Sequence, residues 1–139
     1  MIAYFDSSAF VPLLIDEPAS AAALDLWSDA DRVVSVPLLY VETRAALGRA
    51  RRLSRLAGYS YQSTLALFEL LHRNVAQARI DEELIRRAGE LADAQALRGY
   101  DAMHLATAER LADDDVLFVS GDRALCAAAR ALGLQVSEL

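Results

Sequence analysis

The feature that most constrains the fold of this chain is an alternation of short apolar runs with longer helix-forming stretches. The apolar runs lack sustained alternation with polar residues, and they cover residues 2–5, 33–35, 75–78, 116–119 and 134–136. Short strands that are apolar on both sides are typical of a parallel sheet covered by helices on both faces. The sequence therefore predicts an α/β fold with five strands.

Helix starts are predicted from residues whose side chains can accept hydrogen bonds from the free N–H groups of a first turn. Ser35 is expected to cap a helix over residues 36–55, with Pro37 tolerated in its first turn. Aspartates are expected to cap the later helices, where their charge also favours the helix N-terminus. These predicted caps are Asp81, Asp101 and Asp122.

Length and composition indicate one folded domain over residues 1–139, because 55% of the residues are hydrophobic and 24% are charged. A single cysteine, Cys126, excludes an internal disulfide and a cysteine-rich zinc site. No apolar run approaches the length of a membrane helix, and the amino terminus lacks the positively charged residues that begin a secretory signal. A cytoplasmic protein is therefore expected. All fourteen basic residues are arginine, which excludes enzymes that need a phosphate-loop or Schiff-base lysine.

The net charge of -6 hides a basic segment in the middle of the chain. Residues 32–79 hold eight arginines against two glutamates, whereas the segments on either side are acidic. The strongest cluster lies between residues 44 and 55 and contains no acid. The arginines of this cluster include Arg44, Arg49, Arg51 and Arg52. They either form a strip that binds phosphates or belong to an ordinary solvated helix face, and the sequence leaves both interpretations open.

Four carboxylates stand out because they follow or interrupt apolar segments. Asp6 and Asp122 come just after two predicted strands, and the carboxyl edge of a parallel sheet is where ligands bind. Glu42 shares the apolar face of its predicted helix and should point inward. Asp101 begins a helix, where its carboxylate can both cap and point outward.

Four carboxylates at one edge would repel one another unless a cation lay between them. All-oxygen ligands favour Mg²⁺ or Mn²⁺, ions that support metal-assisted hydrolysis of phosphodiesters. The alternative is structural: Asp6, Asp101 and Asp122 would be plain helix caps, and Glu42 would pair with an arginine such as Arg98 or Arg123. Both interpretations remain open on placement alone.

The ordered set of motifs resembles the PIN-domain ribonucleases, and among them the VapC-type toxins of bacterial toxin–antitoxin pairs. The resemblance spans the whole chain and is carried by the stretch IAYFDSSA at residues 2–9, Glu42 early in a long helix, YDAMHLA at residues 100–106 and VSGDRAL at residues 119–125. It implies a three-layer α/β/α sandwich whose parallel strands follow the order 3-2-1-4-5. That order would place the strands before Asp6 and Asp122 side by side.

The same resemblance implies an endoribonuclease in which Asp6, Glu42 and Asp101 are the central ligands of Mg²⁺ or Mn²⁺ and Asp122 is a more peripheral fourth. Ser8 and Ser120 match hydroxyl positions that support such a site, although threonine is frequent where Ser120 stands. His104 lies on the helix face of Asp101 and is either a support for the site or a structural residue. The arginine cluster gains weight as an RNA contact, and we hypothesise Arg44, Arg49, Arg51 and Arg52 for that role.

The resemblance further implies a homodimer and a small antitoxin that presents a basic side chain to the acidic site. The helical stretch 59–71, with its aromatic and aliphatic residues, is an equally good candidate for an interface and for the core. Two other functions remain as alternatives: a non-catalytic module that binds nucleic acid or protein, and a phosphatase with an aspartate nucleophile. The phosphatase is disfavoured because position 8 is serine where a second aspartate is usual, and because lysine is absent.

Overall fold

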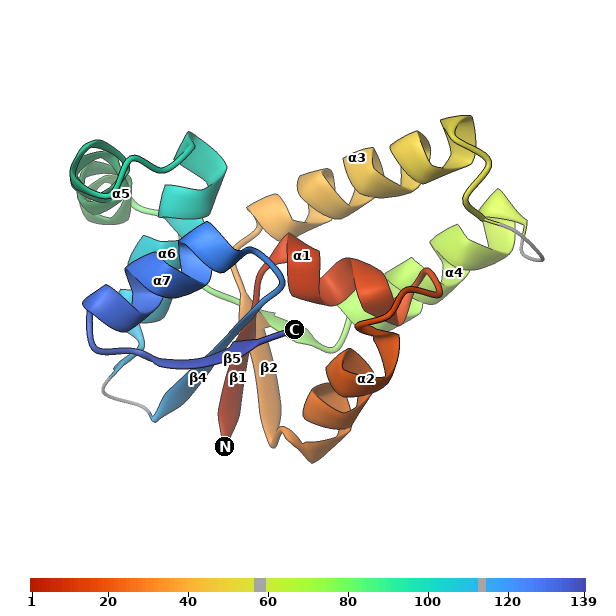
Figure 1. Ribbon diagram of the computed structural model, residues 1–139, viewed down its shortest axis with the longest axis horizontal. Coiled ribbons are helices and arrows are strands. Elements are labelled where there is room, and N and C mark those ends of the chain that lie inside the picture. The colour runs from red at the N-terminus through yellow and green to blue at the C-terminus, as the bar shows by residue number, and fades with distance from the viewer. Residues whose placement is uncertain (57–59, 113–114) are drawn as a thin grey trace.

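The computed structural model describes residues 1–56, 60–112 and 115–139, which form a five-stranded parallel sheet covered by helices (Figure 1). The strands lie in the order β3-β2-β1-β4-β5, and every neighbouring pair is parallel. Their bounds are β1 Ile2–Phe5, β2 Arg32–Ser35, β3 Val75–Gln77, β4 Val116–Ser120 and β5 Gln135–Glu138. All five predicted strands are confirmed, with ends that differ by one or two residues.

Helices connect the strands and cover both faces of the sheet. Their bounds are α1 Ser7–Phe10, the 3₁₀ turn η1 Val11–Leu13, α2 Ser20–Asp29, α3 Leu38–Arg52, α4 Tyr61–His72, α5 Glu82–Ala94, α6 Gly99–Arg110 and α7 Arg123–Ala131. In the described part of the chain, no helix combines the length and apolar character that crossing a membrane requires.

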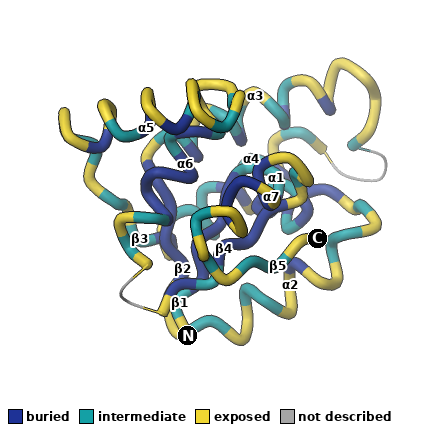
Figure 2. The backbone as a smooth tube through the Cα atoms, turned by 60° about the vertical axis from the view of Figure 1, so that its left-hand side comes forward, coloured by how far each residue is buried: buried dark blue, intermediate teal, exposed yellow. Residues whose placement is uncertain are grey.

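The side chains of each strand alternate between two separate hydrophobic cores. Tyr4, Val34 and Phe118 pack into one core with side chains of α5, α6 and α7. Ala3 and Phe5, the neighbours of Tyr4, pack into the other core, which α1, α3 and α4 help to close. The central strands β1, β2 and β4, which are mostly buried, therefore lie between two outer layers of partly exposed helices (Figure 2). This arrangement confirms the predicted α/β/α sandwich.

Two predicted caps are confirmed: Asp81 accepts a hydrogen bond from the backbone N–H of Leu84, and Asp122 accepts one from that of Leu125. The prediction for Ser35 was wrong, because this serine ends β2 and its hydroxyl donates to the Phe5 carbonyl at 2.7 Å.

Two other helix starts also differ from the prediction. The N-cap position of α3 belongs to Pro37, so the helix begins at Leu38. Asp101 is not a cap, because Arg98 holds the N-cap position of α6 and Asp101 lies in the first helical turn. Its carboxylate is therefore free to face a cavity. The stretch predicted as a helix over 59–72 begins as α4 at Tyr61, and Tyr59 lies outside the described residues.

Strand register brings the ends of β1 and β4 together. Phe5 is the partner of Val119, so Asp6 and Ser120 follow at adjacent positions on the carboxyl edge of the sheet. β1 lies between β2 and β4: the chain passes from β1 to β2 and β3 on one side and then returns to β4 and β5 on the other. Such a reversal of strand order opens a crevice at the carboxyl edge, where α/β proteins bind ligands.

Candidate active site

The four singled-out carboxylates line a single cavity of about 200 Å³ at this edge of the sheet. Asp6 follows β1, Glu42 comes from the second turn of α3, Asp101 from α6 and Asp122 from the start of α7. The remaining lining residues are Ser7, Ser8, Arg98 and Tyr100. Residues far apart in the sequence thus meet at the switch point of the sheet.

Asp6 lies deepest and is only 3% exposed. One of its carboxylate oxygens accepts hydrogen bonds from the Ser8 hydroxyl at 2.7 Å and the Ala9 backbone N–H at 3.0 Å, and the other accepts one from the Ser120 hydroxyl at 2.7 Å. Burial nevertheless raises the pKa of this carboxyl above its ordinary value, because removal from water penalises the charged form more than these donors stabilise it. Asp6 therefore favours a cation beside it.

Ser8 and Ser120 hold Asp6 in one orientation and tie α1 to the end of β4. Their hydroxyls lie 3.1 Å apart, and each also accepts a backbone N–H, from Gly121 at 2.8 Å and from Asp122 at 3.0 Å respectively. A Cβ added at Gly121 would lie 3.4 Å from the Ser8 carbonyl, so the close approach of these two loops favours glycine there. Ser8 and Ser120, which the resemblance gives as supporting positions, thus both contact Asp6 directly.

Glu42 is held by a buried histidine rather than by an arginine. Its Oε1 lies 2.6 Å from Nε2 of His104, and its Oε2 accepts a hydrogen bond from the Ser7 hydroxyl at 3.2 Å. The other ring nitrogen, Nδ1, lies 2.9 Å from the Tyr4 hydroxyl.

A neutral imidazole satisfies this chain when Tyr4 donates to Nδ1 and Nε2–H donates to Glu42. Burial raises the pKa of Tyr4, which keeps its phenol protonated and able to donate. His104 is itself 1% exposed. His104 is thus buried in the core, as a structural residue would be, and it also contacts Glu42, as a residue that supports the cavity would.

Asp101 and Asp122 share a cationic neighbour. The Arg98 Nε donates to Asp101 at 3.0 Å, and another nitrogen of the same guanidinium lies 3.9 Å from Asp122. The hydrogen bond to Asp101 is the main reason that the pKa of Arg98 is raised. Because the Arg98 side chain is 82% exposed, little packing holds it in this position.

The donor chemistry of the cavity fits a hard divalent cation, because all four acids offer carboxylate oxygens and none offers nitrogen or sulfur. The structure also shows that two of these acids attract positive charge, since the guanidinium of Arg98 lies against Asp101 and Asp122. As the side chains stand, no three acidic, histidine or cysteine residues in the described ranges are close enough together to hold a metal ion. Side chains of the cavity would therefore have to move closer together for three of the acids to share one ion.

The predicted RNA-contacting arginines of α3 lie on different sides of the helix. Arg49 follows Glu42 by seven residues, almost two turns, so it lies on the same face as the acid. Arg44 and Arg51 lie toward α4. Arg44 donates to the Tyr40 hydroxyl at 3.1 Å, and that hydroxyl in turn donates to Glu69 of α4 at 2.7 Å. The Arg51 guanidinium lies 4.7 Å from the centre of the Tyr61 ring. Arg52 is exposed at the end of the helix.

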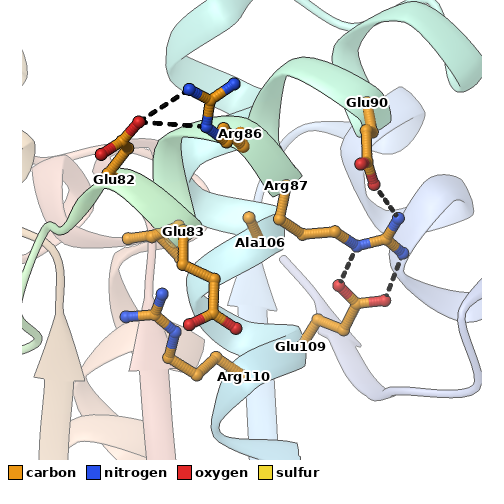
Figure 3. A pocket seen from close by; sticks show the side chains of 9 residues that line it. Glu82, Glu83, Arg86, Arg87, Glu90, Ala106, Glu109 and Arg110 are labelled. Carbon is orange, nitrogen blue, oxygen red and sulfur yellow. Dashed lines mark hydrogen bonds and ion pairs between the residues drawn. The ribbon is translucent and has the colours of Figure 1, made fainter.

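A larger cavity, of about 630 Å³, lies on the outer side of α5 and α6 but has a structural explanation (Figure 3). Arg87 of α5 donates to both carboxylate oxygens of Glu109 of α6, at 2.6 and 2.7 Å. Arg86 makes a bidentate contact with one oxygen of Glu82 on the same helix. These charges already have partners, and they tie α5 to α6.

Sequence reasoning did not identify Ser7, Tyr4 or Tyr100 as parts of the site, and it considered Arg98 only as a partner of Glu42. Ser7 belongs to the same motif as Asp6, which is a usable signal. The other contacts depend on how α6 lies against β1 and α3, which the sequence pattern does not specify. Arg123, the other predicted partner of Glu42, lies instead 3.7 Å from Glu138.

Residues 3–131 match the family model described as PIN domain. The chain is 37% identical over 136 residues to ribonucleases VapC45 and VapC49 of Mycobacterium tuberculosis, strains CDC 1551 and H37Rv respectively, which covers 98% of this chain and 94% of each relative. Its fold is similar to a chain in the crystal structure of VapBC2 from Rickettsia felis bound to a promoter DNA fragment. That match has a TM-score of 0.67 and 11% identity, and it covers 100% of this chain and 99% of the other.

Proposed function

Because the chain belongs to the PIN-domain family and aligns over nearly its whole length with VapC ribonucleases, we propose that it is the endoribonuclease toxin of a toxin–antitoxin pair. The observation that carries the proposal is the convergence of Asp6, Glu42, Asp101 and Asp122 on one cavity at the switch point of the sheet. This arrangement favours hydrolysis at an oxygen-lined cation site over a binding module in which the four acids serve only as caps and ion pairs.

Mg²⁺ or Mn²⁺ is the cation that this donor set suits, with Asp6, Glu42 and Asp101 as its central ligands and Asp122 at the periphery. When bound, such an ion supplies Lewis-acid chemistry: it lowers the pKa of water and neutralises charge on the phosphate.

The chain's own residues would orient the reacting groups. Ser8 and Ser120 fix both oxygens of Asp6, and His104 fixes one oxygen of Glu42, so neither acid needs to reorganise during the reaction. Water is the expected nucleophile, and the expected products carry a 5′ phosphate and a 3′ hydroxyl. Arg49 and Arg52 on α3 lie where they could guide the RNA phosphates that flank the cleaved bond.

An antitoxin is the expected protein partner, because the structurally similar VapBC2 is itself a complex. The contact between Arg98 and two acids of the cavity supports a basic antitoxin side chain as the blocking group. A homodimer is part of the same proposal. In α4, Leu65 and Leu71 belong to the stretch that the sequence left open as interface or core, and both are half-buried against the core, whereas Leu70 is 58% exposed.

RNA cleavage in Mn²⁺ or Mg²⁺ tests the proposal. The parent is expected to cut single-stranded RNA and leave 5′ phosphate ends, and Asp6→Asn is expected to lose at least about a hundredfold in rate because the buried ligand is neutralised. Asp25→Asn, at an exposed acid of α2, is the matched control and should cleave as the parent does. RNA that binds but stays intact in both ions would instead favour the non-catalytic binding module.

A further inference from the structure

An apolar groove lies directly beside the acidic cavity. It has a volume of about 380 Å³ and is bordered by α5, α6 and the start of α3. The lining residues are Leu38, Ile85, Ala88, Gly89, Ala92, Gly99, Tyr100 and Met103. Tyr100 lines both this groove and the acidic cavity, and Asp101, the next residue, lines the cavity alone. The two hollows therefore meet at one aromatic side chain.

The groove is unusual for this surface because none of the side chains that line it is charged. Tyr100 is 58% exposed and Ile85 is 54% exposed, although both are large hydrophobic side chains. The neighbouring surface of α5 is densely charged, as the ion pairs of Arg86 and Arg87 show. An exposed apolar patch within a charged surface indicates a ligand that covers it.

We propose that this groove is a nucleobase subsite, in which the base of a nucleotide next to the cleaved phosphate stacks on the Tyr100 ring. The inference rests on the proposed ribonuclease function and adds a substrate-binding site to it. Tyr100 is a binding residue that sets how firmly the RNA is held, and it takes no part in the hydrolysis itself.

Continuity with the acidic cavity favours a base over other occupants. The nucleotides on either side of a phosphate held at the four acids lie next to that cavity, and the adjoining hollow begins at Tyr100. The ligand chemistry also matches, because a base is planar and uncharged, whereas the charged phosphates have the cavity and the α3 arginines available. Proteins that bind single-stranded RNA commonly stack its bases on exposed aromatic side chains.

The lining also predicts how selective the subsite is. Among the side chains that line the groove, the Tyr100 hydroxyl supplies the only polar atoms able to donate a hydrogen bond to a base. Stacking without further polar contacts tolerates every base, because each has an aromatic face. The groove should therefore contribute affinity with little preference for one base.

Substrates that lack a single base test the proposal at the position it concerns. For the parent, removing the base at one nucleotide beside the cleavage site is expected to raise KM about tenfold and to leave kcat within about twofold. Tyr100→Leu is expected to raise KM for intact RNA by a similar factor. The variant should show no further loss with the abasic RNA, because the ring and the base form one interaction. Tyr100→Phe, which retains the ring, should recover most of the loss.

Filling the groove provides a second test that leaves Tyr100 in place. A Cβ at Gly89 would meet no atom within 4 Å, so the helix can accept a larger residue there. Gly89→Leu should raise KM as Tyr100→Leu does, and Gly89→Ala should have a much smaller effect. Leu70→Ala, which removes an exposed apolar side chain from α4, is the control and should leave KM unchanged.

Several results would overturn the inference. If removing the base raises KM by the same factor in the parent and in Tyr100→Leu, the base does not stack on the Tyr100 ring. An unchanged KM, together with a lower molecular mass in light scattering or weaker antitoxin binding, would assign the groove to a protein partner. If Asp6→Asn abolishes cleavage but Tyr100→Leu leaves KM unchanged, only the subsite is wrong. If the parent cleaves no RNA, the proposed function fails, and anisotropy of labelled intact and abasic RNA then decides on the groove.

Discussion

At the scale of single residues, Asp6 is an acid whose burial is unfavourable for folding and which we propose as a ligand of the cation. The surrounding serines and the Ala9 N–H donate to it, yet burial still raises its pKa. The folded protein therefore favours the protonated carboxyl more than the unfolded chain does. Stability from this preference is fully present below the ordinary pKa of 3.8 and is lost as the pH rises through the raised value.

Asp6→Asn should consequently raise the melting temperature of the metal-free protein near pH 7, because the amide carries no charge to bury. Calorimetry in the presence of a chelator checks this, and the difference from the parent should shrink as the pH falls toward 3.8. A lower melting temperature at pH 7 would mean that hydrogen bonding at Asp6 outweighs the cost of its burial.

Arg98 is a second single residue that affects the site, because its guanidinium lies against two acids that would also attract a metal ion. Its exposed ion pair with Asp101 contributes little stability, and it should compete weakly with a cation. Arg98→Gln is expected to tighten Mn²⁺ binding by about two- to fivefold in titration calorimetry. Arg86→Gln breaks an exposed pair away from the cavity and should leave the affinity unchanged. Weaker Mn²⁺ binding in Arg98→Gln would rule out competition.

Individual acids of the site could be predicted because their positions relative to strands and apolar faces are visible in the sequence. Asp6 and Asp122 follow strands, and Glu42 interrupts an apolar helix face. The bond between His104 and Glu42 and the contact of Arg98 with two acids could not be predicted. Both depend on the distance between α6 and other elements, which no local pattern records.

At the scale of elements, α3 joins the acidic site to the basic part of the chain and extends with α4 past the sheet (Figure 1). Its sequence shows five arginines between residues 44 and 55 but not how they are distributed around the helix axis. Arg49 shares the face of Glu42, whereas Arg51 stacks on Tyr61 of α4. The cluster is thus two surfaces rather than one strip.

Charge reversal should separate these surfaces. Arg49→Glu is expected to weaken RNA binding in chelator and to reduce the slope of log affinity against log salt by about 1, as the loss of one phosphate contact does. Arg51→Glu should have the smaller effect, because its guanidinium is already engaged with Tyr61. Arg86→Glu on α5 serves as a control for net charge. Equal effects of all three reversals would indicate only a general electrostatic attraction.

Asp81 connects two other elements, since it caps α5 and pairs with Arg110 of α6. The Arg110 hydrogen bond and the Leu84 N–H lower the pKa of Asp81, so its stabilisation is present above 3.8 and lost as the pH falls through the lowered value. Asp81→Asn keeps a cap but loses the charge, and it should lower the melting temperature at pH 7 and not at low pH. Asp93→Asn, on the same helix, is the control for the loss of one negative charge and should not lower the melting temperature at pH 7.

Strands and most helices could be predicted, whereas helix starts next to proline could not. Apolar runs between helical stretches were sufficient to identify all five strands. Ser35 was wrongly assigned as a cap because its hydroxyl had a second possible partner, the Phe5 carbonyl on the neighbouring strand. A side chain that can bond either locally or across the sheet is not resolved by sequence pattern alone.

At the scale of the whole molecule, the sheet order is what turns scattered acids into one site. Alternating strands and helices predict a parallel sheet, but the order β3-β2-β1-β4-β5 was expected from the family resemblance rather than from the pattern. That order places β1 beside β4 and so brings Asp6 to Ser120 and Asp122. The nucleobase groove could not be predicted, because it forms only where α5, α6 and α3 meet.

The central claim is that carboxylates from distant parts of the chain jointly bind one hard cation. Electron paramagnetic resonance of free Mn²⁺, titrated with the parent, Asp6→Asn and Asp101→Asn, measures this directly. The account predicts that the parent removes the signal of free Mn²⁺ and that each substitution alone abolishes most of this binding, while Asp25→Asn binds as the parent does. Undiminished Mn²⁺ binding in either Asp6→Asn or Asp101→Asn would contradict it.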